Sequence, residues 1–298
     1  MNRNILIAGW NNAANEFLQK LALFNRELNV TVYTPQRKTD LLEEQAAAAQ
    51  DMANTTHIEA KDQPEWAEQD LVVIFADPSE ENDKEKYEEA LIRQVANNAM
   101  ANGFKGQVCI VAKNDVMDVY AFLRYSGLAS TKVYGLGTSL QTFVVRRMVA
   151  KQLRASVADV KINCIGTAAE NLLAWSRAQF GTSSLLALAA KTNFIFGPDQ
   201  IKQIEENYNA YVAAIYETLV CRILLSIIVA VTGKGHIVQT LSVQQGSKSD
   251  RMVVSRPVLL GRNGIVDLFG VSLSEDEQER YRQIQNDSLN SIASLNKK

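Results

Sequence analysis

The chain has 298 residues and a formal net charge of −2, with 47% hydrophobic and 21% charged residues. This composition is typical of a globular protein with a sizeable core, organised as one large or two moderate domains. The lack of net positive charge argues against a nucleic-acid partner or an anionic membrane surface.

Cysteine usage and hydropathy restrict the class of protein further. Cys109, Cys164 and Cys221 are an odd, widely spaced set, which predicts reduced thiols and neither a disulfide framework nor a metal site. The most apolar run, 219–231, contains Arg222 and is too short to span a membrane. Because the N-terminus enters a strand without a leader pattern, we predict a cytoplasmic protein.

The first stretch of the chain predicts how it begins to fold. Residues 5–8 form an apolar run that is typical of a buried strand, Gly9 ends it, and a helical pattern starts near Ala13. A strand, a glycine turn and a helix open a dinucleotide-binding βαβ unit. The usual G-x-G-x-x-G motif is incomplete, because the second and third glycines are replaced by Asn11 and Ala14.

Two more positions bear on a nucleotide site. A second strand is predicted at 29–34, where an acidic residue would normally bond the ribose hydroxyls. The residue there is Thr34, which carries no charge and offers one weaker hydrogen bond. Trp10 lies inside the glycine turn, where it either blocks the pyrophosphate position or stacks on a ligand.

Strands alternate with helices through the rest of the first half. Further strands are predicted at 70–76, 107–112 and 132–134, and helices at 39–55, 87–102, 116–125 and 144–153. This alternation predicts a parallel sheet with right-handed crossovers. The first half therefore favours a Rossmann domain, which we place at residues 1–157.

The second half has a different pattern. A strand is predicted at 159–165, a helix at 170–180 and a long helical pattern with room for one break at 200–231. Strands follow at 240–243, 252–260 and 266–270, with a hairpin turn at 261–264, and a polar helix at 274–294 ends the chain. We therefore predict a C-terminal α+β domain at residues 158–298.

The order and spacing of several segments resemble the lactate/malate dehydrogenase family, particularly its L-2-hydroxyisocaproate dehydrogenase branch. The segments are NILIAGWNNAA, DLVVIFADP, GFKGQVCIVAKNDVMDV, SGLASTKVYGLGTSLQTFVVRR, IGTAAENLLAWS and RPVLLGRNGIVDLFGVSLSEDEQ. The resemblance runs nearly end to end. It implies a Rossmann domain followed by a substrate and oligomerisation domain, with NAD as the cofactor and a 2-hydroxy acid as the substrate.

The same resemblance implies that the catalytic residues of the family are not retained. The position of the proton-transferring histidine corresponds to Ala168, and that of its orienting aspartate to Gln141. The arginine that binds the substrate carboxylate corresponds to Val144, and the arginine of the mobile loop falls in an acidic stretch near Glu81. Imidazole suits the proton transfer because its pKa lies near neutrality. Of the active-site positions, only Asn114 is retained.

Few residues elsewhere in the sequence offer a replacement. The only histidines, His57 and His236, lie outside the corresponding segment, which also leaves the serines without a triad partner. Arg146 lies two residues beyond the substrate-binding position, and on a helix it would point to another face. If a dinucleotide binds, the matching contact positions are Gly9, Asn11, Asn12, Thr34 and Asn114.

Two functions from different classes follow from these residues. We predict a lactate/malate dehydrogenase-family homologue without 2-hydroxyacid dehydrogenase catalysis, a pseudoenzyme with a ligand-binding or interaction role. No cofactor is expected to bind tightly, and NAD is the one expected if any binds. Its partners would be copies of itself, as a dimer or tetramer, or an active paralogue. The alternative is an active NAD-dependent L-2-hydroxyacid oxidoreductase for lactate, malate or 2-hydroxyisocaproate, with displaced catalytic residues.

Overall fold

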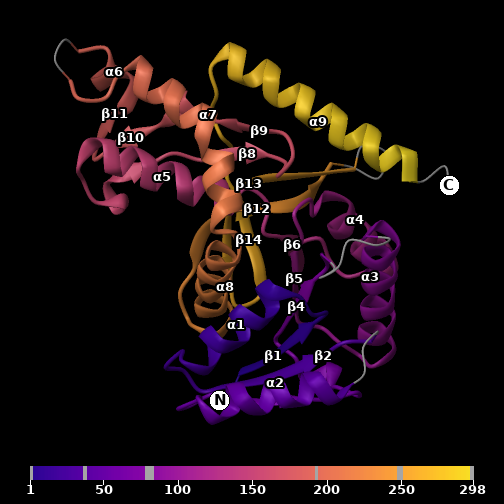
Figure 1. Cartoon of the computed structure of the whole chain (residues 1–298). Coiled ribbons are helices and arrows are strands. Elements are labelled where there is room, and N and C mark those ends of the chain that lie inside the picture. The colour runs from indigo at the N-terminus through magenta and orange to yellow at the C-terminus, as the bar shows by residue number, and fades with distance from the viewer. Residues whose placement is uncertain (1–2, 36–38, 78–83, 192–193, 247–250, 296–298) are drawn as a thin grey trace.

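The computed structural model describes residues 3–35, 39–77, 84–191, 194–246 and 251–295. In the first half, strands and helices alternate as the sequence predicts, with one additional strand, β3 (Figure 1). The elements are β1 (Arg3–Ala8), α1 (Asn12–Ala22), β2 (Leu28–Tyr33), α2 (Thr39–Asp51), β3 (His57–Ala60), β4 (Leu71–Phe75), α3 (Lys84–Ala101), β5 (Gln107–Val111), α4 (Val116–Ser126) and β6 (Val133–Gly135).

The second half combines short strands with long helices. Its elements are α5 (Ser139–Leu153), β7 (Val160–Lys161), β8 (Cys164–Gly166), β9 (Asn171–Leu173), β10 (Gln179–Phe180), β11 (Ser183–Ser184), α6 (Leu185–Ala189), α7 (Pro198–Ala214), α8 (Tyr216–Thr232), β12 (Ile237–Gln245), β13 (Met252–Gly261), β14 (Gly264–Leu268) and α9 (Glu275–Leu295). The hairpin predicted at 261–264 joins β13 to β14.

One sheet runs through both halves of the molecule. Within the described ranges it has eleven strands, in the order β3-β2-β1-β4-β5-β6-β12-β13-β8-β9, with β14 paired to β13. The strands from β3 to β6 are parallel. β12 then joins β6 in antiparallel orientation, where Ser242 faces Gly135. The sheet therefore continues across residue 157, and the division into domains there stays a prediction.

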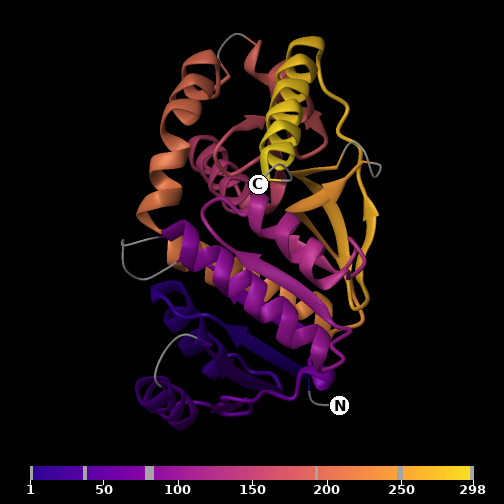
Figure 2. The same cartoon turned by 90° about the vertical axis from the view of Figure 1, so that its right-hand side faces the viewer.

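The parallel part of the sheet has a hydrophobic core on each face. Ile5 and Ile7 belong to the core that includes residues of α1 and α8, whereas Leu6 and Ala8 belong to the core that includes residues of α3 and α4. Successive side chains of a strand point to opposite faces, so a continuous apolar run is the pattern expected of β1. Figures 1 and 2 show α3 and α4 on one side of these strands, with α1 and α8 on the other.

Two predicted elements of the second half differ from the structure. The helix predicted at 170–180 is wrong: this segment forms β9, a 3-10 turn at Trp175–Arg177 and β10. Pairing of β9 with β8 and of β10 with β7 satisfies its backbone instead. The helical pattern at 200–231 does contain its break, at Ile215 between α7 and α8.

The length and hydropathy of the helices bear on whether one of them could span a membrane. Among the described helices, no single one is long and apolar enough to cross a membrane. Only α7 and α8 taken together reach the required length and composition, and this pair is bent by 86°.

Candidate functional site

The turn after β1 keeps the glycine that the fold requires. Gly9 has φ +80°, and a Cβ atom at this position would lie 2.5 Å from the carbonyl oxygen of Phe75. Its amide donates to the carbonyl of Tyr33 at 3.0 Å. Both constraints come from neighbouring strands of the sheet. Gly9 is therefore explained by backbone packing, whether or not a ligand binds.

Asn11 occupies the position where the family motif has its second glycine. It is the N-cap of α1: its Oδ1 accepts from the amide of Ala14 at 2.9 Å, and its Nδ2 donates to the carbonyl of Asp77 at 2.9 Å. Free amides at a helix N-terminus are what a phosphate binds. A pyrophosphate at this turn would have to displace the Asn11 carboxamide, so the residues present do not fit that group. Asn12, the first residue of α1, is exposed.

Thr34 and Trp10 are the other two residues predicted to bear on a nucleotide at the turn after β1. Thr34 directly follows β2, and its Oγ1 is buried without a hydrogen-bond partner among the described residues. It therefore offers a single hydroxyl at the position where a ribose would need a carboxylate. Trp10 is 5% exposed and belongs to the hydrophobic core, which favours packing over stacking on a ligand.

Asp77 connects several elements at the carboxyl edge of the parallel sheet. The amide of Lys113, after β5, lies 3.2 and 3.0 Å from the two carboxylate oxygens of Asp77. The hydroxyl of Tyr216, at the start of α8, donates to the same carboxylate at 3.5 Å. Burial, followed by the negative charge of Asp77, raises the pKa of Tyr216. In doubly wound sheets a dinucleotide binds across this edge. Here the contacts of Asp77 with Lys113 and Tyr216 lie along part of the same edge.

The positions that correspond to catalytic residues lie on α5 and in the turn between β8 and β9. Gln141 and Val144 of α5 are both buried, and Gln141 Oε1 has no hydrogen-bond partner among the described residues. Ala168 is half-buried in the β8–β9 turn. The two elements lie side by side, since Thr142 Oγ1 accepts from the amide of Cys164 at 3.0 Å.

Two other positions complete the comparison with the predicted site. Asn114 is exposed just beyond β5. Glu81, the position predicted for the mobile-loop arginine, lies outside the described residues. The described parts of the predicted site therefore contain an amide, an apolar branched side chain and a methyl group at the positions where the resemblance implies an acid, a cation and a base.

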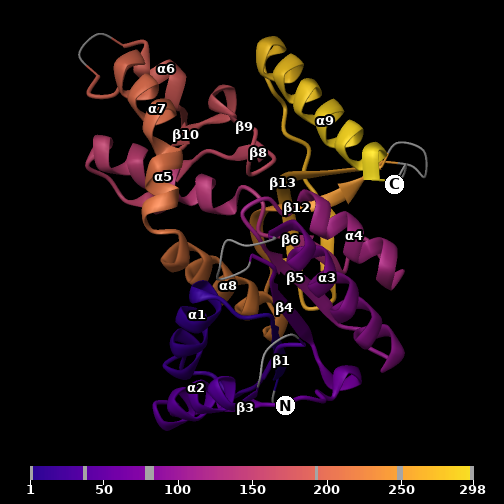
Figure 3. The ribbon, with the colours of Figure 1, turned by 45° about the vertical axis from the view of Figure 1, so that its right-hand side comes forward.

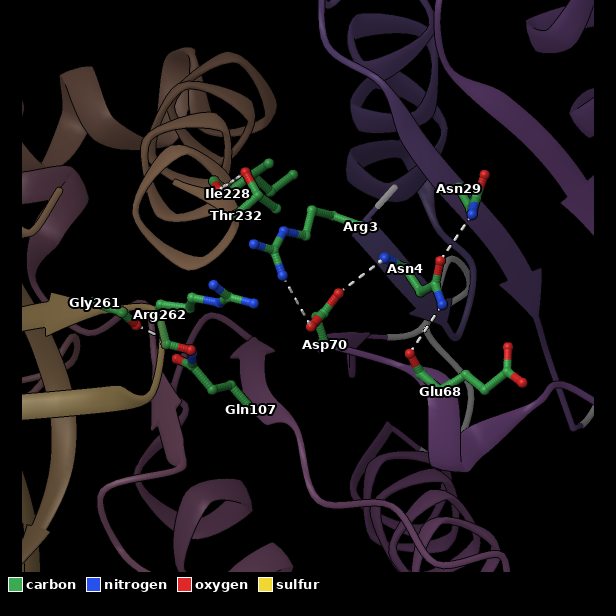
Figure 4. Close-up of polar contacts among 10 residues, drawn as sticks. All are labelled: Arg3, Asn4, Asn29, Glu68, Asp70, Gln107, Ile228, Thr232, Gly261 and Arg262. Carbon is green, nitrogen blue, oxygen red and sulfur yellow. Dashed lines mark hydrogen bonds and ion pairs between the residues drawn. The ribbon is translucent and has the colours of Figure 1, made fainter. Parts of the chain in front are cut away.

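Both histidines lie at the opposite edge of the sheet. His57 is the first residue of β3. The ring of His236 packs against Gly261, where an added Cβ would lie 2.4 Å from it. Gln107, the first residue of β5, donates to the Gly261 carbonyl at 3.1 Å (Figure 4). The length of β5 separates this edge from the carboxyl edge by roughly 15 Å, at about 3.3 Å per residue.

Arg146 lies on α5 and Arg222 lies beside it, and each side chain contacts other residues of the protein. Arg146 donates through Nε to the carbonyl of Ile162 and through Nη2 to Asn163 Oδ1, both at 2.8 Å, and burial lowers its pKa. The exposed Arg222 of α8 lies 5.0 Å from the ring centre of Phe143 in a cation–π contact. Sequence reasoning did not single out Arg222 for this place, because its partner is distant in the chain.

A buried polar network, also missed from the sequence, joins the two halves. Asp115 accepts from the amide of Gly137 and from Ser242 Oγ, both at 2.7 Å. Ser242 Oγ lies 3.0 Å from Ser255 Oγ, which accepts from the amide of Thr138 at 3.1 Å. Burial raises the pKa of Asp115 to about 6, although the bonds from Ser242 and Gly137 act in the opposite direction.

Metal chemistry requires a cluster of ligands. Within the part of the chain that the structure describes, no group of three or more histidine, cysteine, aspartate or glutamate residues could hold a metal ion.

Comparison with known sequences identifies bacterial L-lactate dehydrogenases. The chain is 27% identical over 201 residues to the enzyme of Bacillus pumilus (strain SAFR-032), a match that covers 64% of this chain and 63% of the relative. It is 26% identical over 230 residues to the enzyme of Geobacillus stearothermophilus, covering 71% of each chain. In the first of these matches the chain spans slightly less than two thirds of its relative. No family model matches the sequence.

Comparison with solved structures covers nearly the whole chain. A lactate dehydrogenase from a Medee basin deep-sea metagenome library gives a TM-score of 0.88 at 17% identity and covers 99% of both chains. Cryptosporidium parvum malate dehydrogenase gives 0.85 at 19% identity and covers 100% of both chains. Lactate dehydrogenase from the same organism, complexed with lactic acid and β-nicotinamide adenine dinucleotide, gives 0.84 at 17% identity, with coverage of 99% and 98%.

The shared architecture is that of dehydrogenases with a Rossmann-type parallel sheet continued by an antiparallel second half. Taken with the sequence relatives, it supports the lactate/malate dehydrogenase family for this chain. The fold predicted from the sequence is therefore confirmed and the predicted family is supported, whereas the L-2-hydroxyisocaproate branch stays a prediction.

Proposed function

We propose that this chain is a lactate/malate dehydrogenase-family protein that does not reduce 2-oxo acids and serves as a ligand-binding or interaction protein. The observation that supports this most directly is Ala168, in the turn that would carry the proton donor, with both histidines at the far edge of the sheet. General acid–base catalysis contributes about 10²–10⁴-fold to a rate. A substrate carboxylate facing Val144 in place of arginine would lose about 2 kcal/mol or more.

The contacts at the glycine turn support weak cofactor binding. NAD is the cofactor we expect if any binds, and its contacts would come from the positions Gly9, Asn11, Asn12, Thr34 and Asn114. The Asn11 carboxamide is held by Ala14 and Asp77 at the start of α1, where a phosphate would be expected to bind. Displacing it would leave two hydrogen bonds unmade, so we expect no tight binding.

An assay of NADH oxidation with pyruvate, oxaloacetate and 2-oxoisocaproate tests the proposal. We expect no detectable turnover with any of them, and a rate within tenfold of a typical 10 s⁻¹, about 1 s⁻¹ or more, would overturn it. NADH fluorescence measures cofactor binding separately. The variant Asn11→Gly removes the carboxamide and should strengthen NADH binding relative to the matched control Asn12→Gly, without producing turnover.

Two side chains favour the alternative, an active oxidoreductase with displaced catalytic residues. Tyr216 presents a half-buried phenol against Asp77, and Arg222 places a guanidinium over Phe143, next to the predicted substrate-binding position of α5. If turnover is found, Tyr216→Phe and Arg222→Gln should each reduce it at least tenfold. Turnover that survives both substitutions would exclude these residues as the replacements.

Assembly and location are also part of the proposal. We expect a homo-oligomer, as a dimer or tetramer, with an active paralogue as the other candidate partner, in the cytoplasm. Exposed apolar side chains support an interface: Leu41 on α2, Tyr211 on α7 and Ile215 at the break after α7. Size-exclusion chromatography with light scattering should give a mass of two or four chains, and a monomer at micromolar concentration would contradict the homo-oligomer.

A further inference from the structure

A cavity of about 470 Å³ lies between α9 and the sheet, and none of the site positions discussed above lines it. Figure 3 shows α9 running beside the end of β13. The cavity has the size of small-molecule sites, which span about 300–1,000 Å³. Its lining is mostly polar and comes from β13, the segment after β14, and α9: Arg256, Gly270, Val271, Ser272, Leu273, Gln278, Tyr281, Arg282 and Gln285.

Arg256 of β13 contributes a positive charge to this cavity. Its Nε and Nη2 donate to the carbonyl of Phe269 at 3.2 and 2.7 Å, and its Nη1 donates to Gln245 Oε1 at 2.7 Å. Both acceptors are neutral, and no described carboxylate forms an ion pair with Arg256. The guanidinium is therefore fixed in place with its charge uncompensated, and two of its five N–H groups remain free.

Other polar groups of the lining are also available. The side chains of Tyr281, Gln278 and Gln285 make no hydrogen bond within the described part of the chain. Tyr281 and Arg256 line the same cavity, and burial raises the pKa of Tyr281 while the positive charge of Arg256 lowers it in part. The hydroxyl keeps its proton at neutral pH and can donate. Arg282 is paired with Glu279 at 3.3 Å.

The wall of the cavity is held by contacts outside the lining. Arg177 donates through Nε to the carbonyl of Ser272 at 2.6 Å. The Glu277 carboxylate accepts from the amides of Ser176 at 3.0 Å and Ser274 at 3.2 Å, so its charge is already bonded. A cavity that exists before the ligand arrives loses less free energy to ordering when the ligand binds.

We propose that this cavity binds a small organic anion, a carboxylate or a phosphate ester. Its acidic group would accept from the two free N–H groups of Arg256 and from the hydroxyl of Tyr281. A planar guanidinium suits this role, because its N–H groups match the spacing of carboxylate and phosphate oxygens. The amides of Gln278 and Gln285 would bond the polar remainder of the ligand. This site does not depend on what happens at the dehydrogenase cleft.

Calorimetric titration of the full chain tests the proposal at low ionic strength, with inorganic phosphate, glycerol 3-phosphate and succinate as probes. We expect at least one probe to bind, and the two organic probes distinguish a phosphate ester from a carboxylate. Tyr281→Phe should weaken binding about tenfold, as expected for one hydrogen bond to a charged group. Arg282→Gln should weaken it about threefold, because this cation is exposed and already paired.

Arg280→Gln is the matched control, since Arg280 is on the same helix, is exposed and does not line the cavity. It should bind the probe as the original protein does. Arg256→Gln should abolish binding, and circular dichroism shows whether that variant folds. If it does not fold, Tyr281→Phe and Arg282→Gln still decide the question. Absence of binding by every probe at 10 mM, or equal affinity of Tyr281→Phe and Arg280→Gln, would overturn the proposal.

Discussion

The turn after β1 and the turn between β8 and β9 are each built on a glycine, and in each of them the resemblance predicts a replaced functional residue. Gly9 and Gly166 both have positive φ angles, +80° and +115°, and an added Cβ would lie 2.5 Å and 2.7 Å from a backbone oxygen. The replaced positions differ. At the first turn Asn11 fills the space with two hydrogen bonds, whereas at the second Ala168 leaves a half-buried methyl group.

This difference separates two kinds of substitution. The first turn has gained contacts that stabilise the protein without a ligand, so a change there should alter stability. At the second turn the corresponding position is a half-buried methyl group, so a change at Ala168 should alter stability little. The backbone contacts of Gly9 and Gly166 also explain why the fold needs a glycine in each turn.

The largest expected effect on the free energy of unfolding comes from Gly9, which the fold requires whether or not the protein is an active enzyme. Gly9→Ala should lower the free energy of unfolding by about 3–5 kcal/mol, because the methyl group meets the Phe75 carbonyl at a positive φ. Urea denaturation measures it. Gly103→Ala is the control: its φ is +73° with open space around it, and it should lose only about 1 kcal/mol. Equal losses would refute the packing argument.

The next largest effect on the free energy of unfolding comes from a buried carboxylate on α4. Asp118 of α4 is buried, and its Oδ2 has no hydrogen-bond partner among the described residues. Burial raises its pKa to about 8, with further contributions from the charges of Glu88, Asp115 and Asp77. Because the pKa is higher in the folded state, this contribution to stability is complete below about pH 4 and is lost as the pH rises to about 8.

Asp118→Asn should therefore be more stable than the original protein at pH 8, by about 2 kcal/mol, and no more stable at pH 4. Urea denaturation at both pH values measures the difference. A variant that is destabilised equally at the two pH values would show that the carboxylate makes a contact the structure does not contain.

The contacts of Asn11 predict a smaller change. Asn11→Ala should lower the free energy of unfolding by about 1.5 kcal/mol, through loss of the helix cap and of the bond to the Asp77 carbonyl. Asn12→Ala, one residue along and exposed, should change it by less than about 0.5 kcal/mol. If both variants have the same stability, Asn11 does not hold the turn closed.

The smallest effect on stability is expected at Ala168, where the side chain is only a methyl group. Ala168→His places an imidazole in a half-buried turn and should change the free energy of unfolding by less than about 0.5 kcal/mol. NADH oxidation with pyruvate should stay undetectable, because the cofactor and carboxylate positions remain substituted. Measurable activity in this variant would show that the first turn accepts NADH despite Asn11.

The parallel half could be predicted because its central strands are buried on both faces. Residues 5–8 and 71–75 are continuous apolar runs, whereas β3 was missed because only Ile58 of its four residues is fully buried. The helix predicted at 170–180 failed for a different reason. Leu172, Leu173 and Trp175 have a spacing that suits either a helix face or a short strand, and only the pairing with β8 decides between them.

The substitutions of the candidate site could be identified from the resemblance, but not the contacts that replaced them. Asn11 and Asp77 are separated by 66 residues, and Asp77 and Tyr216 by 139. Neither pair shares a periodic pattern or a motif. Hydrogen bonds of this kind depend on the crossing of distant elements, which local spacing in one sequence does not specify.

The junction of β6 with β12 has a consequence for dissecting the molecule. Strand pairing and the bonds of Asp115 to Gly137 and Ser242 cross from one half to the other. A fragment ending at residue 157 would turn β6 into an open edge and leave a buried carboxylate short of a donor. The chain should consequently melt in one cooperative transition, and its first half alone should not fold as an autonomous nucleotide-binding module.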